Sequence, residues 1–142
     1  MQIQATAVAM DGRAIVMSGP PGIGKSSLAL ALIDRGATLI GDDGITLIRN
    51  GKALMASPAP NISGLLEVRG VGLVECATAT APVALLVQFG EDGERLPTAL
   101  PCTNLAGKAV PTLHLCAPDW STPLRIEQAL ARFGTLPSVT AD

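Results

Sequence analysis

The run Gly19-Pro20-Pro21-Gly22-Ile23-Gly24-Lys25-Ser26 decides the fold of this chain, because it matches the phosphate-binding pattern G-x-x-x-x-G-K-[ST]. The glycines lack a Cβ atom, so the backbone can adopt positive φ and bring its N–H groups close to phosphate oxygens. Lys25 is expected to contact the β and γ phosphates, and the Ser26 hydroxyl is expected to help hold Mg²⁺. The run therefore predicts a site for ATP and Mg²⁺.

The residues on either side of this run predict a strand, a loop and a helix. Residues 13–18 are mostly apolar and predict a buried strand, while residues 26–35 carry apolar side chains at helical spacing, followed by Gly36 as a helix end. This order favours a phosphate-binding loop over the alternative, a glycine-proline turn that carries Lys-Ser by chance. The residues expected to bind the cofactor are Gly19, Gly22, Ile23, Gly24, Lys25, Ser26 and Ser27.

Composition excludes several classes of protein. The chain has 142 residues, of which 48% are hydrophobic, and this predicts one folded domain over residues 1–142. Aromatic residues make up 2% and the net charge is −2, so nucleic-acid binding is not expected. The chain shows neither a clean membrane-spanning run nor the basic start of a signal peptide, which indicates a cytoplasmic protein. Three widely spaced cysteines fit buried free thiols, and the single histidine, His114, weighs against a metal site.

The rest of the chain predicts mainly strands. Asn50-Gly51 is typical of a two-residue hairpin, residues 57–61 predict a loop, and residues 123–133 predict a last helix that ends at Gly134. Because so many strands follow the first helix, the sequence predicts an α/β fold with a mixed sheet rather than a doubly wound parallel one. The predicted strands cover residues 3–10, 37–41, 45–49, 52–55, 83–89 and 112–115.

Two adjacent carboxylates, Asp42 and Asp43, end the strand predicted at residues 37–41, which we expect beside the strand that feeds the loop. Strand ends are where open α/β sheets place ligands. Neighbouring residues on an extended chain point in opposite directions. One aspartate is therefore expected to face the phosphates as a general base for an incoming hydroxyl, while the other orients the metal or the backbone. The alternative is that Asp42-Asp43-Gly44 only forms a turn.

A carboxylate and a guanidinium, Glu67 and Arg69, lie two residues apart in the strand-like segment 65–74 and hence on one face. The carboxylate is suited to a metal or to the region of the phosphoryl acceptor, and the guanidinium is suited to neutralise developing charge. The alternative is a surface ion pair on a half-exposed strand. A further acidic group, at residues 91–94, follows the predicted strand 83–89 in a turn-rich setting that favours a solvated loop.

Three segments, in this order, resemble the catalytic, C-terminal domain of the HPr kinase/phosphorylase family. They are residues 22–26 with the helix that ends Asp34-Arg35-Gly36, the segment Leu39-Ile40-Gly41-Asp42-Asp43, and the segment Leu65-Leu66-Glu67-Val68-Arg69-Gly70-Val71-Gly72. The third is similar to the family signature L-L-E-[IV]-R-G-[LV]-G. The resemblance covers roughly the first half of the chain and implies a phosphoenolpyruvate-carboxykinase-like P-loop fold in a short form without the family's N-terminal domain.

The resemblance also implies an activity. Members of the family use ATP and Mg²⁺ to phosphorylate a serine of HPr, the phosphocarrier of the sugar phosphotransferase system, and many reverse the reaction with inorganic phosphate. They assemble into multimers, so a homo-oligomer is possible here. By resemblance, Asp42 would be the acid/base for the serine hydroxyl with Asp43 as its supporting partner. The implied catalytic residues are Lys25, Asp42, Asp43 and Arg69, and the implied metal-binding residues are Ser26, Asp43 and Glu67.

The chain departs from the family pattern at three places. Counting back from the loop, the active-site histidine of the family falls on Gln4, which holds no proton at neutral pH. The residue after the loop serine is usually acidic and is Ser27 here. Residues 108–120 show no match to the arginine-bearing loop of the long form. These departures weigh against the reverse, phosphorylase reaction and leave the acceptor protein open.

Three functions remain open at the level of sequence. The first is an ATP-dependent protein-serine kinase that acts on an HPr-like carrier and thereby regulates carbon metabolism. The second is a small-metabolite kinase, which would carry a lid with clustered arginines that this chain lacks. The third is a regulatory module that binds nucleotide without catalysis, favoured by Gln4 and Ser27 and opposed by the intact Asp42 and Asp43. Nothing in the sequence indicates what recognises the adenine base.

Overall fold

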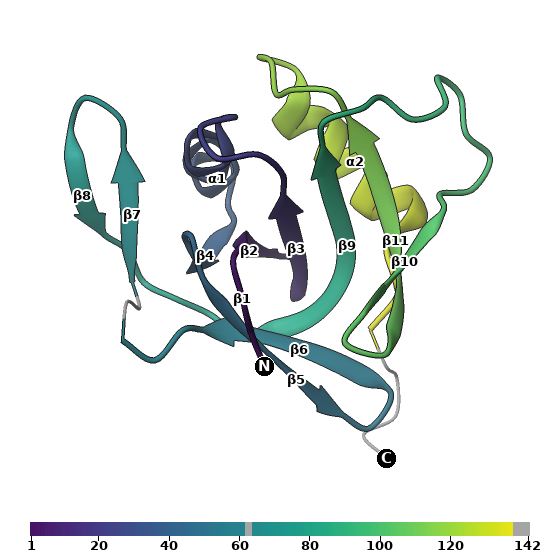
Figure 1. The fold of residues 1–142 in the computed structure, drawn as a ribbon, viewed down its shortest axis with the longest axis horizontal. Coiled ribbons are helices and arrows are strands. Elements are labelled where there is room, and N and C mark those ends of the chain that lie inside the picture. Colours follow the sequence, from purple (N-terminus) through teal and green to yellow (C-terminus); the bar gives the residue numbers. More distant parts are fainter. Residues whose placement is uncertain (62–63, 138–142) are drawn as a thin grey trace.

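The computed structural model describes residues 1–61 and 64–137, which form eleven strands and two helices (Figure 1). In chain order they are β1 (Gln2–Ile3), β2 (Thr6–Met10), β3 (Arg13–Ser18), α1 (Lys25–Asp34), β4 (Thr38–Gly41), β5 (Ile45–Asn50), β6 (Ala53–Pro58), β7 (Leu65–Val68), β8 (Gly72–Glu75), β9 (Ala81–Phe89), β10 (Cys102–Leu105), β11 (Lys108–Leu115) and α2 (Thr122–Phe133).

Nine of these strands form one sheet in which parallel and antiparallel pairs mix, as the sequence predicted. Strand β9 lies between β3 and β11 and is parallel to both. Strand β2 is antiparallel to β3 on one side and to β4 on the other. The three parallel strands therefore end at the same edge of the sheet. From that edge the chain leaves β3 toward α1 and leaves β11 toward α2 (Figure 1).

The sheet curls because β9 is long and takes different partners along its length. Its first residues, Ala81 and Pro82, pair with β6, and its later residues pair with β3 and β11. Strands β1, β5 and β6 thus continue the sheet in a direction that folds back across it (Figure 1). A separate two-stranded hairpin, β7–β8, stands off the main sheet beside α1.

The two faces of the sheet bury two separate apolar clusters. On β2 and β3, Val8, Ile15 and Met17 point toward the face that α1 and α2 cover. The alternate residues Ala7 and Val16 point toward the face that β1, β5 and β6 cover. All five side chains are fully buried, as the two-residue period of a strand requires when both faces are covered. This packing fixes the position of β3, and with it the start of the glycine-rich loop.

Both helices lie within one residue of their predicted positions. The helix expected at residues 26–35 runs from Lys25 to Asp34, and the one expected at residues 123–133 runs from Thr122 to Phe133. Gly36 has a φ of 109°, the left-handed conformation expected of a glycine after a helix end. In the hairpin β5–β6 the two turn residues are 51 and 52, one position later than predicted.

Several strand predictions were wrong at their ends. The single strand expected at residues 3–10 is two strands, because β1 pairs with β5 whereas β2 pairs with β3 and β4. Strand β6 continues to Pro58, into the predicted loop, and β9 begins at Ala81 rather than at residue 83. Strand β11 begins at Lys108 rather than at residue 112, and β10 lies in a stretch with few sequence signals. Pro111 lies within β11. Because proline is uncommon inside strands, the sequence did not predict a strand at this position.

The cysteines are free thiols, as predicted, but they are not buried. Cys102 and Cys116 are exposed and Cys76 is half-buried. Cys76 packs against the edge of the core, whereas Cys102 on β10 and Cys116 after β11 face solvent, and the spacing of cysteines in a sequence does not reveal this difference. Within the described part of the chain, no helix has the length and apolar character needed to cross a membrane.

Candidate active site

The glycine-rich loop joins the end of β3 to the first turn of α1, at the edge where the parallel strands end. Its tight path depends on glycine, because Gly22 and Gly24 have φ values of 77° and 113°. A Cβ atom on Gly19 would lie 2.8 Å from the Cβ atom of Phe89 on the neighbouring strand β9. Ile23 packs its side chain against the core, so it offers only its backbone to a ligand.

The Lys25 ammonium lies over the loop itself. Its Nζ atom donates hydrogen bonds to the carbonyl oxygens of Gly19, at 2.8 Å, and Pro20, at 3.1 Å. Both acceptors belong to the loop that the sequence predicts to surround phosphate groups. The positive charge is therefore held at the loop, where the N-terminal end of α1 adds partial positive charge of its own.

Asp42 is buried and connects three elements. Its carboxylate accepts hydrogen bonds from the Ser26 hydroxyl at 2.8 Å, from the Thr6 hydroxyl at 3.1 Å and from the Glu67 backbone N–H at 3.0 Å. These donors come from α1, β2 and the hairpin β7–β8. The side chain is only 8% exposed. Asp42 is thus the point that fixes the loop serine relative to the hairpin.

The placement of the strand before Asp42 differs from the prediction. Strand β4 does not lie beside β3; it pairs with β2, which separates it from β3. Asp42 still reaches the loop, because the register of the β2–β4 pair shifts between Ala7 and Val8 and brings Thr6 and Asp42 together. The strand order was therefore wrong, although Asp42 still contacts the loop serine.

Asp43 points elsewhere than its neighbour, as expected, but the cause is a turn rather than an extended chain. Its φ is 64°, a conformation uncommon for a residue with a side chain. Asp43 is exposed and lines a cavity of about 190 Å³ at the loop, whereas Asp42 does not line it. The other lining residues are Pro21, Gly22, Gly24, Lys25, Ser26, Ser27, Glu67 and Arg69.

Glu67 and Arg69 reach this cavity from the hairpin β7–β8. Glu67 lies on β7, and Arg69 follows the end of that strand. The opposite side of β7 anchors the hairpin, because Leu66 is fully buried in the core. Among the described residues the sole salt bridge joins Arg35 to Glu127, so Glu67 and Arg69 do not form the surface ion pair that was the alternative.

Asp43 also lines a second hollow, of about 290 Å³, on its other side. Gln4 lies in this hollow, together with Pro60 and Asn61 from the end of the hairpin β5–β6. The backbone between β1 and β2 therefore passes close to the candidate site. This agrees with the place that the family resemblance gives to Gln4.

The oxygen atoms around the 190 Å³ cavity are suited to coordinate Mg²⁺ that is bound together with a nucleotide. Nowhere in residues 1–61 and 64–137 do three His, Cys, Asp or Glu side chains form a cage for a metal ion. The cavity offers the Ser26 hydroxyl and the carboxylates of Asp43 and Glu67. Mg²⁺ is usually held by one or two carboxylates together with substrate phosphates, so this oxygen set is sufficient.

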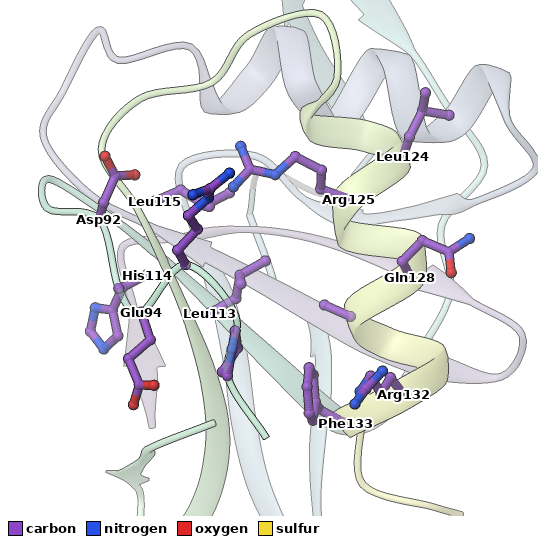
Figure 2. Close-up of a pocket in the computed structure, with 14 residues that line it drawn as sticks. Asp92, Glu94, Leu113, His114, Leu115, Leu124, Arg125, Gln128, Arg132 and Phe133 are labelled. Carbon is purple, nitrogen blue, oxygen red and sulfur yellow. The ribbon is translucent and has the colours of Figure 1, made fainter. Parts of the chain in front are cut away.

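A larger cavity than the one at the loop lies between β11 and α2, with a volume of about 630 Å³. Figure 2 shows Arg125, Gln128 and Arg132 along one side of α2, with Leu113 and Leu115 of β11 facing them. His114 is half-buried and also lines this cavity. Three arginines, Arg95, Arg125 and Arg132, line this cavity and are suited to bind an anion. The lining includes no residue of the glycine-rich loop and neither Asp42 nor Asp43, so its size alone does not make it the site of phosphoryl transfer.

The role of Asp42 leads to a stability prediction for Asp42→Asn. The two carboxylate oxygens accept hydrogen bonds from three donors, and an amide would turn N–H groups toward some of those donors. We expect a loss of about 1–3 kcal/mol in the free energy of unfolding, measured by urea denaturation. Asp43→Asn is the matched control, because Asp43 is exposed and should change stability by less than about 0.5 kcal/mol. Equal unfolding midpoints for the two variants would contradict the role given to Asp42.

Residues 1–81 match the family model described as the HPr Serine kinase C-terminal domain. The match covers more than half of the chain and includes every residue that lines the 190 Å³ cavity. The chain belongs to the HPr kinase family.

Curated relatives agree with the assignment to the HPr kinase family. An HPr kinase/phosphorylase of Chlorobium phaeobacteroides is 32% identical over 128 residues, which is 80% of this chain and 38% of the relative. One of Caldicellulosiruptor bescii is 30% identical over 122 residues, 76% of this chain and 39% of the relative. The chain thus spans less than two fifths of the length of these relatives.

A solved structure extends the likeness to nearly the whole fold. The HPr(Ser) kinase/phosphatase of Coxiella burnetii superposes with a TM-score of 0.78 and 25% sequence identity, over 92% of this chain and 88% of that one. The mixed α/β fold with its curled sheet is therefore the fold of HPr kinases. Strands β10 and β11 and helix α2, which the family model does not cover, lie within a fold similar to this structure.

Proposed function

We propose that this member of the HPr kinase family transfers the γ-phosphoryl group of ATP, with Mg²⁺, to a serine hydroxyl of an HPr-like phosphocarrier protein. The names of its relatives support the acceptor, and the loop motif supports the donor. The proposal places the protein in the cytoplasm, where both substrates would occur. It is confined to the forward reaction, because Gln4 supplies no proton at neutral pH.

The observation that carries the proposal is the position of Asp43 between two hollows. On one side it faces the cavity formed by the glycine-rich loop, Lys25 and Arg69. On the other side it faces the hollow that contains Gln4. Phosphoryl transfer to a hydroxyl requires a base in contact with that hydroxyl. It also requires the attacking oxygen, the γ-phosphorus and the leaving oxygen to lie roughly in line. A carboxylate between two such spaces can meet both demands.

We therefore assign the two aspartates different tasks. Asp43 takes the proton of the serine hydroxyl as that oxygen attacks the γ-phosphorus, since it is exposed to the acceptor side. Asp42 is a positioning residue, because its carboxylate is occupied by three donors and holds Ser26 in place. This assignment exchanges the two roles that the family resemblance implies, in which Asp42 is the acid/base and Asp43 is its supporting partner.

The cations of the cavity act on the transferred group. Lys25 and Arg69 line the same cavity and neutralise charge on the phosphoryl oxygens as the bond to the leaving group breaks. Ser26 and Glu67 would hold Mg²⁺, which when bound would neutralise charge on the phosphate oxygens, while the Asp43 carboxylate is left to the acceptor hydroxyl. Little else is required of the protein, because catalysis of phosphoryl transfer consists mainly of positioning and charge stabilisation.

Transfer of label from γ-³²P-ATP to purified HPr tests the proposed function, with Lys25→Ala as the diagnostic variant. We expect wild-type protein to label HPr, and Lys25→Ala to lower the rate by about 10²–10³-fold because a cation at the phosphates is lost. Lys52→Ala is the control, since Lys52 is an exposed lysine in the β5–β6 turn and should retain full activity. Nucleotide binding by the wild type without any labelling would favour the regulatory module instead.

A further inference from the structure

The single tryptophan of the chain, Trp120, is 84% exposed. The other aromatic side chains are two phenylalanines, one buried in the core and one half-buried at the end of α2. Tryptophan side chains are usually largely buried. A tryptophan that faces water does not gain the free energy that burial of its apolar surface would give. Exposed aromatic rings of this kind are typical of surfaces that bind a ligand.

The position of Trp120 relates it to the glycine-rich loop. It lies in the loop between β11 and α2, at the same edge of the sheet as the loop between β3 and α1 (Figure 1). The two loops touch, since a Cβ atom on Gly24 would lie only 3.2 Å from the Cγ atom of Pro118. Trp120 follows Pro118 by two residues, a span of at most about 7 Å. The indole is therefore within reach of a ligand held at Gly24.

The backbone around Trp120 is fixed by hydrogen bonds on both sides. The Asp119 carboxylate accepts from the Ser121 backbone N–H at 2.8 Å and from the Ser121 hydroxyl at 2.7 Å. The Asp119 N–H donates to the Thr122 hydroxyl at 2.8 Å, where α2 begins. The hydrogen bonds from Ser121 hold the pKa of the Asp119 carboxyl below its ordinary value. Trp120 is thus exposed on an ordered turn.

The cavity at the loop has room for only part of a nucleotide. Its volume is about 190 Å³, whereas sites that enclose a whole ligand of nucleotide size measure about 300–1,000 Å³. Apart from Pro21, its lining is glycine, lysine, arginine, hydroxyl and carboxylate groups, which suit a triphosphate, and it includes no aromatic side chain. The base of a bound nucleotide must lie outside this cavity, on a neighbouring loop.

We propose that Trp120 is the platform on which the nucleoside base stacks, an inference that rests on the proposed function. The phosphates lie at the glycine-rich loop, and the ribose directs the base past Pro118 toward the indole. Stacking on an aromatic face tolerates different bases, because every base has a π-face. This explains how the chain binds ATP although its sequence contains no motif for adenine.

Intrinsic fluorescence tests the contact, because Trp120 is the sole tryptophan and the chain has no tyrosine. The full 142-residue protein is titrated with MgATP and, separately, with magnesium tripolyphosphate, which has the phosphates but no base. We expect MgATP to quench the indole emission and tripolyphosphate to bind without quenching it. Calorimetry measures the two dissociation constants independently of the fluorescence signal.

Substitution of the indole gives the second measurement. Trp120→Ala should weaken MgATP binding by about 5- to 150-fold, the loss expected for one base–aromatic stack, and leave tripolyphosphate binding unchanged. Trp120→Phe keeps an aromatic face and should retain most of the affinity for MgATP. Leu136→Ala is the control for loss of an exposed apolar side chain, since Leu136 is 79% exposed and follows the far end of α2.

The results separate this inference from the proposed function. Equal MgATP affinity in Trp120→Ala and wild type overturns the inference and leaves the function standing, even if labelling of HPr falls. Equal weakening of MgATP and tripolyphosphate also overturns it, because Trp120 would then act on the loop rather than on the base. If wild-type protein binds neither MgATP nor tripolyphosphate, the proposed nucleotide site itself is contradicted, and the inference falls with it.

Discussion

Asp43→Asn should lower the rate of phosphoryl transfer to HPr by about 10²–10⁴-fold, the usual contribution of a general base. The amide keeps the shape of the side chain but cannot take the proton of the attacking serine hydroxyl. Because the carboxylate acts on the acceptor hydroxyl, the dissociation constant for MgATP should change by less than about threefold. Initial rates of labelling at saturating ATP and HPr, with calorimetry for ATP, measure both effects.

The variant Asp42→Asn distinguishes the assignment of Asp43 as the general base from the alternative, in which Asp42 is the general base. Asp42 is surrounded by the donors of Thr6, Ser26 and Glu67, so its substitution should destabilise the fold and disturb ATP and Mg²⁺ binding through Ser26. We expect its loss of rate to be partly restored by raised Mg²⁺ concentration, whereas Asp43→Asn should not respond to Mg²⁺ in this way. An Asp43→Asn variant with near wild-type rate, beside an inactive but stable Asp42→Asn variant, would show that Asp42 is the base.

Gly41→Ala should lower the free energy of unfolding by about 3 kcal/mol, near the upper end of the cost of overpacking a well-packed site. A Cβ atom at this position would lie 2.3 Å from the backbone oxygen of Gly44 and 2.9 Å from the Cγ2 atom of Ile45. The obstacle is backbone, so it cannot rotate away. The chain must shift directly before Asp42 and Asp43. For a domain of this size we expect the melting temperature to fall by roughly 10 °C.

Gly93→Ala is the matched control for this substitution. Gly93 also lacks a positive φ, and the nearest neighbour of its added Cβ atom would be the Cβ atom of His114 at 3.4 Å. It lies in the exposed loop after β9, away from the aspartates. We expect a change in stability of less than about 0.5 kcal/mol. A stable and active Gly41→Ala variant would mean that the turn holding the aspartates has another conformation.

The parts of the site that the sequence predicted are those that depend on local chemistry. The glycine-rich loop requires glycine for its backbone conformation and lysine and serine for its ligands, so residues 19–26 predict it directly. Glu67 and Arg69 were predicted from their two-residue spacing in one strand-like segment, although β7 ends at Val68 and Arg69 lies in the turn of the hairpin. The structure brings these segments together at one cavity with Asp43. The catalytic roles of the residues remain predictions that the variants above test.

The parts that the sequence did not predict depend on pairing between distant segments. Strand β4 pairs with β2 rather than with β3, and no local pattern distinguishes these two partners. Strand β11 was recognised only at its end, because Pro111 is unusual within a strand. The approach of the loop that carries Trp120 to the glycine-rich loop was not predicted for the same reason. In that loop, Pro118 meets Gly24 only after β11 has paired with β9.

A crystal structure of the chain with Mg²⁺ and a non-hydrolysable ATP analogue tests the central claim most directly. We expect the terminal phosphate in the 190 Å³ cavity, within hydrogen-bond distance of the Lys25 ammonium, with the Asp43 carboxylate between that phosphate and the hollow that contains Gln4. A terminal phosphate bound in the cavity between β11 and α2, or an Asp43 side chain directed away from the phosphates, would contradict it.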